Sequence, residues 1–438
     1  MTTNGRSGNL SITMTGRPLH VCLVSQEYPP ETARGGIGTQ TCYKARELAR
    51  LGNSVHVLSS SAAPDLTLRT TFEDGITVHR MPAVGHESGN DLPIYNTATY
   101  WLGYTWSVLR YLHGLMQKTV FDVIDFAEYG AEGFAYQLDR GPWNWAPVVV
   151  QLHGSLPSFT KHIGWPEKDS ELHRVGTFME GVSIQLADGL MSCSASTADL
   201  ASHFYGVPRQ SIDVVYCGVD AEAFRPGPAN EHPTDRPTVL FVGNIAKNKG
   251  VQTALEAVLK LRSKYPTIRL QVLGRSDDDL EEKLQEQARA EGAGSNVEFY
   301  GFVGRERLPE FYRRADVFCS PAQYEPLGIV YLEAMASGRP VVATSVGGAP
   351  EAVVDGETGI VVPPLDAGEV ARALDLLLGD TQLRHRMGAA GRKRVEDIFA
   401  MDRHIQRVLA VYEKTIELSR QKLDRSREAA FLAEGCPK

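Results

Sequence analysis

Short runs of apolar residues, many of them β-branched, alternate with segments of helical periodicity along almost the whole chain. These runs lack a polar face, as expected of parallel strands that helices cover on both sides. In the first half we predict strands at residues 21–25, 54–58, 122–125, 148–152, 189–192 and 213–216. In the second half we predict them at residues 238–242, 269–273, 297–299, 317–320, 341–343 and 359–361. This alternation predicts an α/β protein with doubly wound sheets.

A helix predicted at residues 38–51 shows how the helical segments are patterned. Its apolar and small side chains recur every three to four residues, which is the spacing of a helix packed on one side. We expect the inward positions to be Thr41, Ala45, Leu48 and Ala49. We expect the outward positions to be Lys44, Arg46, Glu47 and Arg50.

Residues 225–237 interrupt the alternation with prolines at positions 226, 228, 233 and 237. Such a segment is typical of a linker, which we place at 226–237. It would separate a Rossmann-like domain at 18–225 from a second one at 238–400, the two facing each other across a cleft. Residues 1–17 are polar, and we expect a flexible tail there. Residues 401–438 predict a long, charged C-terminal helix.

Size and charge narrow the class of protein. A chain of 438 residues is too long for one ordinary core, which agrees with two domains. The net charge of −8 argues against nucleic acid as the main partner. The six cysteines form no CxxC pair, so we expect a reduced cytoplasmic setting without a zinc site. No run approaches the ~18 apolar residues that cross a bilayer.

The segment from Glu325 to Glu333, Glu-Pro-Leu-Gly-Ile-Val-Tyr-Leu-Glu, is the strongest functional candidate. Pro326 keeps Glu325 extended, and residues 329–336 predict a helix. Glu325 would then precede a helix N-terminus, where free backbone N–H groups suit a phosphate, and Glu333 would lie inside the helix. Carboxylates on both sides of a phosphate fit a sugar nucleotide, with its sugar, diphosphate and ribose.

Loops after two other predicted strands carry further candidates. Ligands of open α/β sheets bind at the carboxyl ends of strands. Gly36 ends the loop after the first strand and would let backbone N–H groups approach an anion, although a plain surface loop fits equally well. Asn244, Lys247 and Lys249 follow the strand at 238–242, where a lysine could neutralise a departing diphosphate. An isolated Lys-x-Lys-Gly is more often a solvated basic turn.

His153 and Phe302 lie beyond the ends of two more predicted strands. A lone histidine is more often structural, but Gly154 and the strand end favour a place in the cleft for His153. Phe302 follows a glycine turn, where aromatic and backbone groups could hold a planar base. An ordinary buried turn explains Phe302 equally well.

Several well-known catalytic motifs are absent from the sequence. There is no GxSxG, no HExxH and no GxxxxGK[ST] phosphate loop, and the cysteine and histidine spacings suit no zinc site. Two carboxylates could indicate glycoside hydrolysis. However, Glu325 and Glu333 would both lie beside one phosphate-binding helix end, which suits binding a charged donor.

Taken in order, these motifs resemble the retaining glycosyltransferases of family 4, which have the GT-B fold. The segment from Glu325 to Glu333 is similar to the E-x7-E element of that family. The matching sets are Gly35-Gly36, His153-Gly154, Cys217-Gly218-Val219-Asp220, Asn244 through Lys249-Gly250 and Gly347-Gly348-Ala349-Pro350-Glu351. The likeness covers roughly residues 18–400.

The resemblance implies that the second domain binds the donor. Glu333 would bind ribose hydroxyls, and Glu325 would bind hydroxyls of the donor sugar. Backbone N–H groups at the helix start would meet phosphate or sugar; they belong to Leu327, Gly328 and Ile329.

It implies further contacts around the donor. Lys249 would contact the diphosphate, and Phe302 would border the base. His153 would lie against the transferred sugar, and Gly36 would approach from the opposite wall. The family usually has arginine where this chain has Asn244, so a fixed cation is missing, and Lys247 could replace it.

The implied reaction transfers a hexosyl unit from a UDP-, GDP- or ADP-sugar to a hydroxyl acceptor, with retention and without metal or cofactor. The acceptor would be a saccharide, a lipid-linked molecule or a small molecule. We favour front-face attack, in which the leaving phosphate oxygen takes the acceptor proton; double displacement through Glu325 is the rival. A sugar-nucleotide epimerase or hydrolase, or a non-catalytic sugar-nucleotide-binding module, are the alternative functions.

Residues 95–115 are rich in aromatic side chains and contain one basic residue, Arg110. Such a stretch could line an acceptor groove or contact a membrane surface as a peripheral anchor. An amphipathic helix packed on the first domain is the simpler alternative.

Overall fold

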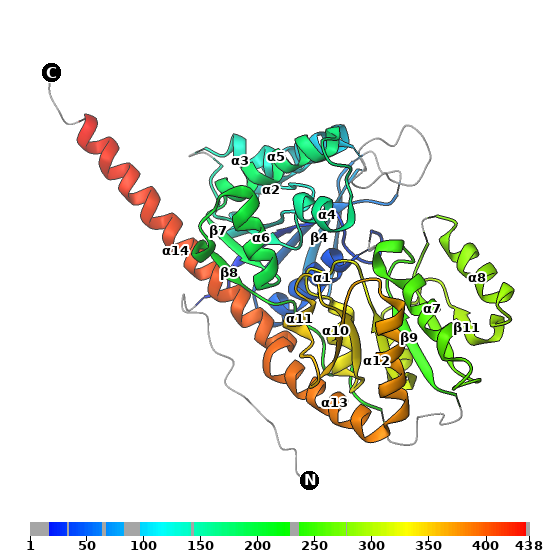
Figure 1. The fold of residues 1–438 in the computed structure, drawn as a ribbon. Helices are drawn as coiled ribbons and strands as arrows, with labels where there is room; N and C mark the ends of the chain where they lie inside the picture. The colour runs from blue at the N-terminus through cyan, green and yellow to red at the C-terminus, as the bar shows by residue number, and fades with distance from the viewer. Residues whose placement is uncertain are drawn as a thin grey trace, which may run out of the picture.

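A computed structural model describes residues 17–32, 35–63, 67–82, 97–141, 144–227, 236–276 and 278–434, with side chains of the last helix described to residue 423. These residues form two α/β halves, each around its own sheet (Figure 1). We call them the first and second domains. The predicted tail and most of the predicted linker lie outside the described residues.

The first sheet has the strand order β3-β4-β2-β1-β5-β6-β7-β8. Neighbours pair in parallel, except that β3 pairs antiparallel with β4. The strands are β1 (His20–Val24), β2 (Ser54–Ser60), β3 (Arg69–Glu73), β4 (Ile76–Met81), β5 (Val123–Ala127), β6 (Val148–Leu152), β7 (Gly189–Ser192) and β8 (Ile212–Val214).

The hairpin β3–β4 is absent from the sequence prediction. Its turn consists of Asp74 and Gly75, both with positive φ, at 51° and 80°. Asp-Gly is a favoured two-residue hairpin turn because glycine and aspartate tolerate this backbone. The signal was obscured because β3 is polar and mostly exposed, so it lacks the apolar pattern of the covered strands.

The second sheet is parallel throughout its described pairs, in the order β11-β10-β9-β12-β13-β14. Its strands are β9 (Thr238–Val242), β10 (Arg269–Leu273), β11 (Val297–Phe299), β12 (Val317–Ser320), β13 (Val341–Thr344) and β14 (Gly359–Val362). The sequence prediction for these six strands is confirmed to within one residue. Both halves therefore have the predicted α/β architecture.

Helices cover both sheets on both faces. The first domain contains α1 (Gly36–Arg50), α2 (Ala98–Met116), α3 (Phe134–Asp139), α4 (Leu156–Ile163), α5 (Glu171–Leu186), α6 (Ala195–Tyr205) and η2 (Arg209–Ser211). The second contains η3 (Lys247–Lys249), α7 (Val251–Leu261), α8 (Leu280–Ala290), η4 (Gly294–Asn296), α9 (Leu308–Arg314), α10 (Ile329–Ala336), α11 (Ala349–Ala352), α12 (Ala367–Gly379), α13 (Thr381–Arg394) and η5 (Val395–Phe399).

The last helix, α14 (Met401–Glu434), returns to the first domain (Figure 1). It buries Ile405, Val408 and Tyr412 in the same apolar cluster as strands β1 and β2. The Tyr412 hydroxyl also donates a hydrogen bond to Asp125 of β5. The C-terminal segment of the chain thus completes the core of the first domain.

Lys44 of α1 corrects the predicted outward face of that helix. Its side chain is buried, and its ammonium lies 2.5 Å from the Asp125 carboxylate and 2.6 Å from Gln151 Oε1. The ion pair compensates the cost of removing the charge from water. The helical pattern alone could not reveal this, because the partners are on strands β5 and β6.

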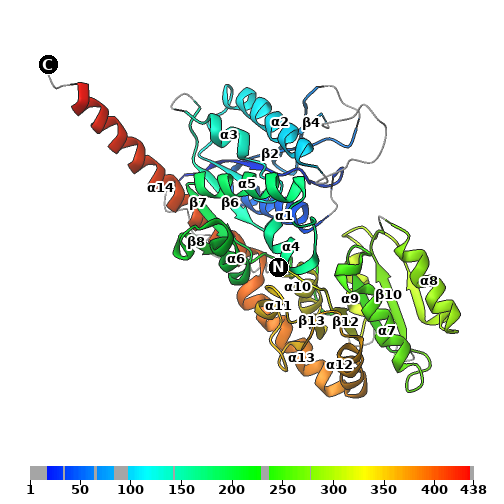
Figure 2. The same ribbon diagram turned by 45° about the horizontal axis from the view of Figure 1, so that its top comes forward.

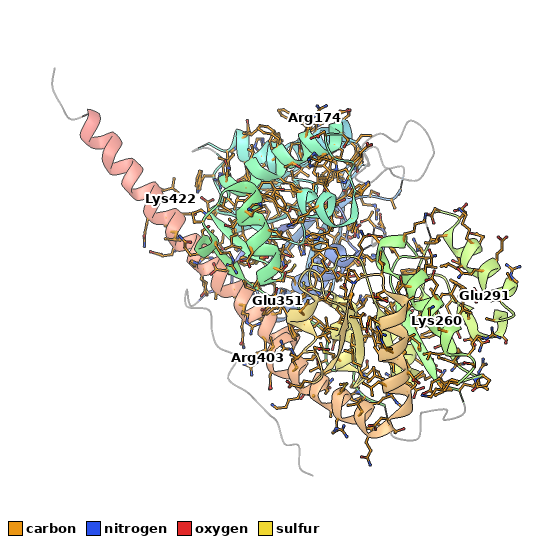
Figure 3. The ribbon with its side chains drawn as sticks, in the orientation of Figure 1. Arg174, Lys260, Glu291, Glu351, Arg403 and Lys422 are labelled. Carbon is orange, nitrogen blue, oxygen red and sulfur yellow. The ribbon has the colours of Figure 1, made fainter. Side chains whose placement is uncertain are left out.

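The two domains contact each other where the carboxyl ends of their strands meet. Glu351 of α11 accepts hydrogen bonds from the backbone N–H groups of Ala195 and Ser196 at the start of α6, both at 2.7 Å. Figure 3 shows Glu351 at this junction, and Figure 2 shows the two domains from a second direction. A carboxylate at a helix N-terminus is favourable because it satisfies free N–H groups. The facing loops of the two domains are therefore in direct contact.

Candidate functional site

Lys249 and Glu325 form an ion pair at the centre of the site. Lys249 Nζ lies 2.9 Å from Glu325 Oε2, and the side chains are 33% and 15% exposed. Lys249 ends the η3 turn after β9, whereas Glu325 lies on the loop after β12. The structure therefore brings together two predicted residues that are 76 positions apart.

Backbone contacts hold Glu325 in place. Gly348 N–H donates to the Glu325 carbonyl at 2.9 Å. Gly347 has φ of +84°, and a Cβ there would overlap that carbonyl. A left-handed backbone and a close approach both require glycine at this position. The predicted Gly347-Gly348 turn thus packs directly against the backbone of Glu325 and fixes its position.

The helix predicted at residues 329–336 is confirmed as α10. Its N-cap is Gly328 with φ of +91°, and Leu327 is buried just before it. A Cβ on Gly36, the first residue of α1, would lie 3.2 Å from Ile329 Cδ1. The starts of α1 and α10 therefore face each other across the domain junction. Both present backbone N–H groups that suit an anion.

Glu333 lies one turn into α10 and is 2% exposed. Arg305 Nη2 donates to one carboxylate oxygen at 2.7 Å, and the Tyr312 hydroxyl donates to the other at 2.8 Å. Arg305 also donates to the hydroxyl of Tyr43 on α1, with its Nε at 3.0 Å. These partners compensate the buried charge. A carboxylate has about four acceptor positions, so capacity for further donors remains.

Asn244, Lys247 and Phe302 surround the same strand ends. Asn244 and Lys247 are both exposed, and the side chain of Phe302 is also open to solvent. The guanidinium of Arg275 stacks on the Phe302 ring at 4.3 Å from its centroid. Arg275 also accepts a backbone hydrogen bond from Ile245 at 2.7 Å, which places a cation beside the Asn244 loop.

His153 and Gly154 turn sharply after β6. The Glu128 carboxylate accepts hydrogen bonds from His153 N–H at 2.6 Å and from Gly154 N–H at 2.5 Å. Gly154 has φ of +136°, and a Cβ there would lie 3.0 Å from Pro326 Cγ. Burial lowers the pKa of His153 to about 3, helped by the charges of Lys44 and His404. The imidazole is therefore neutral at physiological pH.

Burial raises the pKa of Glu128 to about 7, although its hydrogen bonds from backbone N–H groups oppose this shift. Glu128, Arg305 and Tyr43 were not among the residues proposed from sequence. Their roles depend on partners in distant strands and helices. A glutamate directly after a buried strand was the one available signal for Glu128.

The aromatic segment predicted at residues 95–115 forms α2, while residues 95 and 96 lie outside the described structure. Tyr100, Trp101 and Tyr104 are buried in the core, as the simpler alternative expected. Trp106, by contrast, is 62% exposed. Among the described residues, no helix has the length and apolar character needed to span a membrane.

Two parallel-sheet domains with facing strand ends, a glycine-flanked helix start and an E-x7-E pair define a GT-B glycosyltransferase. Family models agree with this class. The model "Glycosyltransferase Family 4" matches residues 34–223, and "Glycosyl transferases group 1" matches residues 227–394. The chain belongs to glycosyltransferase family 4, and it is a retaining enzyme that uses a nucleotide-sugar donor.

Relatives cover nearly the whole chain. The D-inositol 3-phosphate glycosyltransferase 2 of Catenulispora acidiphila is 30% identical over 429 residues, covering 92% of this chain and 97% of that protein. The glycogen synthase of Mycobacterium tuberculosis is 29% identical over 394 residues, covering 87% and 91%. Sucrose-phosphate synthase from Thermosynechococcus elongatus has the same fold, with a TM-score of 0.76, 23% identity, and coverage of 93% and 100%.

Proposed function

We propose that the donor diphosphate binds between the facing starts of α1 and α10, next to Lys249. The support is the Lys249–Glu325 ion pair, which lies beside the start of α10 and opposite Gly36 and Gly154. With the diphosphate in this position, the N–H groups from Leu327 to Ile329 bind phosphate, and Glu325 accepts hydrogen bonds from the donor sugar. Glu333 binds the ribose, and Phe302 borders the base.

The reaction follows from this arrangement. The bond between the anomeric carbon and the diphosphate oxygen breaks, while the acceptor oxygen bonds to the same face of that carbon. The departing phosphate oxygen takes the acceptor proton. Lys249 stabilises the negative charge that develops on the diphosphate. Because Lys249 already engages one oxygen of Glu325, front-face attack is favoured over a covalent intermediate on that carboxylate.

Arg275 and Lys247 replace the cation that Asn244 lacks. Arg275 lies beside the Asn244 loop and is held over Phe302, so its charge is close to where the nucleotide would bind. Lys247 is exposed on the same loop. Side-chain cations thereby neutralise the diphosphate, and the transfer proceeds without a metal.

The acceptor offers a hydroxyl group from the first-domain side of the cleft, where His153 lies against the transferred sugar. We place the enzyme in the reducing cytoplasm, because Cys22, Cys42, Cys193, Cys217 and Cys319 are all buried free thiols. Exposed Leu102 and Trp106 on α2 offer a peripheral membrane contact. Flotation with phospholipid vesicles tests it; recovery of wild type and Trp106→Ala in equal amounts would remove α2 from that role.

A thermal-shift screen over UDP-, GDP- and ADP-sugars tests the donor site. The true donor raises the melting temperature because it binds the folded state. Glu333→Gln should lose this shift, whereas Glu291→Gln, on the exposed end of α8, should keep it. The same shift in wild type and Glu333→Gln would remove Glu333 from the site. Release of a rearranged sugar without acceptor would instead indicate an epimerase.

A further inference from the structure

Four aromatic side chains, three from the first domain and one from the second, form a continuous series of contacts that we call the Trp165 cluster. Trp165 and Tyr129 have ring centroids 6.5 Å apart, and Tyr129 and Phe159 are 5.8 Å apart. Phe159 in turn lies 5.9 Å from Tyr324, the residue before Glu325. The cluster therefore connects the centre of the site with an exposed ring at its outer end.

Hydrogen bonds fix the segments on either side of the outer ring. The Thr160 hydroxyl donates to the Pro166 carbonyl at 3.0 Å, and Gln323 Nε2 of the second domain donates to the His162 carbonyl at 2.8 Å. Tyr129 packs edge-on against the buried ring of Trp101 at 5.7 Å. A platform already fixed in this way loses little conformational entropy when a ligand binds.

The cluster adjoins the site of transfer. A Cβ on Gly154 would lie 3.0 Å from both Phe159 Cζ and Pro326 Cγ, so the Phe159 ring reaches the turn that faces Glu325. Tyr129 follows β5 and Gly154 follows β6, at the carboxyl strand ends where ligands of such sheets bind. A molecule lying over the outer ring could therefore extend into the reaction site.

The chemistry around Trp165 favours a sugar ring over a lipid chain. Trp165 is 37% exposed, and the neighbouring loop and helix end carry exposed charges of both signs, on Lys161, Glu167, Lys168 and Asp169. The face of an indole ring is electron-rich. The C–H groups of a pyranose carry partial positive charge because oxygens flank them, so they suit that face. Sugar hydroxyls suit the charged surroundings, which an acyl chain does not.

We propose that Trp165 is the stacking platform of an acceptor subsite for a pyranose ring, and that the acceptor is a saccharide or glycoside. The inference rests on the proposed function, because it takes the second domain as the donor side. It adds the chemical class of the acceptor, which family membership leaves open.

Binding to a printed array of neutral gluco-, manno- and galacto-oligosaccharides tests this proposal, with the donor thermal shift recorded for every variant. The proteins are wild type, Trp165→Ala, Trp165→Phe and the control Trp106→Ala, which removes an indole from α2 that is 62% exposed, more than the 37% of Trp165. Trp165→Ala should lose about tenfold or more in apparent affinity for the bound glycans. Trp165→Phe should retain part of the glycan affinity, and Trp106→Ala should bind glycans as tightly as wild type.

Two results would overturn the subsite. One is unchanged glycan binding by Trp165→Ala; the other is wild-type protein that binds the donor but no glycan on the array. Binding to phosphatidylglycerol vesicles that is lost in Trp165→Ala, with no glycan binding, would assign the platform to lipid instead. Absence of a thermal shift with every donor in wild type would count against the proposed function. That outcome differs from donor binding without glycan binding, which contradicts only the acceptor subsite.

Discussion

The two walls of the site use carboxylates in different ways. On the second-domain wall, Glu325 and Glu333 pair with cations, Lys249 and Arg305. On the first-domain wall, Glu128 and Glu132 are buried and accept hydrogen bonds from backbone N–H groups of the cleft loops. One wall thus holds its carboxylates in ion pairs, while on the other wall they fix the shape of the backbone.

Replacing Lys249 should have the largest effect on the charged wall. Lys249→Ala removes the cation that we propose stabilises the leaving diphosphate, and we expect kcat to fall by over a hundredfold, about 3 kcal/mol. Release of nucleoside diphosphate from the donor that the thermal-shift screen selects measures this. Lys260→Ala, an exposed lysine on α7, is the control and should keep wild-type turnover. Normal turnover in Lys249→Ala would refute its role.

Glu128 tests the buried wall through pH. Its folded-state pKa of about 7 lies above the ordinary value of 4.5. The associated stability is therefore fully present below pH 4.5 and is lost as pH rises to about 7, up to ~3 kcal/mol. Melting temperatures at pH 5 and pH 7.5 should differ less in Glu128→Gln than in wild type. Equal pH dependence of the melting temperature in both proteins would mean that folding does not raise the pKa of Glu128.

Glu333→Gln should weaken donor affinity by about 1–3 kcal/mol, because it removes the charged hydrogen-bond acceptor that we propose for the ribose. Calorimetric titration with the donor measures the change, and kcat at saturating donor should change much less. Equal loss of kcat and affinity would indicate that Glu333 acts on the transition state rather than on ribose binding.

Tyr43→Phe should have the smallest effect of the series. It removes the hydroxyl that Arg305 contacts across the domain junction while keeping the ring on which the guanidinium stacks, 4.7 Å from its centroid. We expect a loss of about 1 kcal/mol in stability, the value of one hydrogen bond. Chemical denaturation measures it. A loss of unfolding free energy well above 1 kcal/mol would mean that this contact contributes more to the domain junction than one hydrogen bond.

Sequence patterns predicted the covered parts of the fold well. The strands of the second sheet and the helix at 329–336 were located because their apolar runs and their Pro-x-Gly start are local signals. The edge strand β3 was missed because it is polar and mostly exposed. The burial of Lys44 was missed because its partner Asp125 is distant in sequence. Local motifs identify Glu325 and Lys249 as candidate site residues. Their ion pair, and the contact of Arg305 with Glu333, could not be predicted because each joins segments that are distant in sequence.

The return of α14 to the first domain has a consequence for biosynthesis. Val411 and Ile416 fill the same apolar layer as Val21 and Val57, although almost the whole polypeptide separates them. During synthesis the ribosome makes the first domain before the second, but the side chains of α14 that complete its core follow the second domain in the sequence. The nascent first domain must therefore wait, with part of its interior uncovered, until the second domain and α14 have been synthesised.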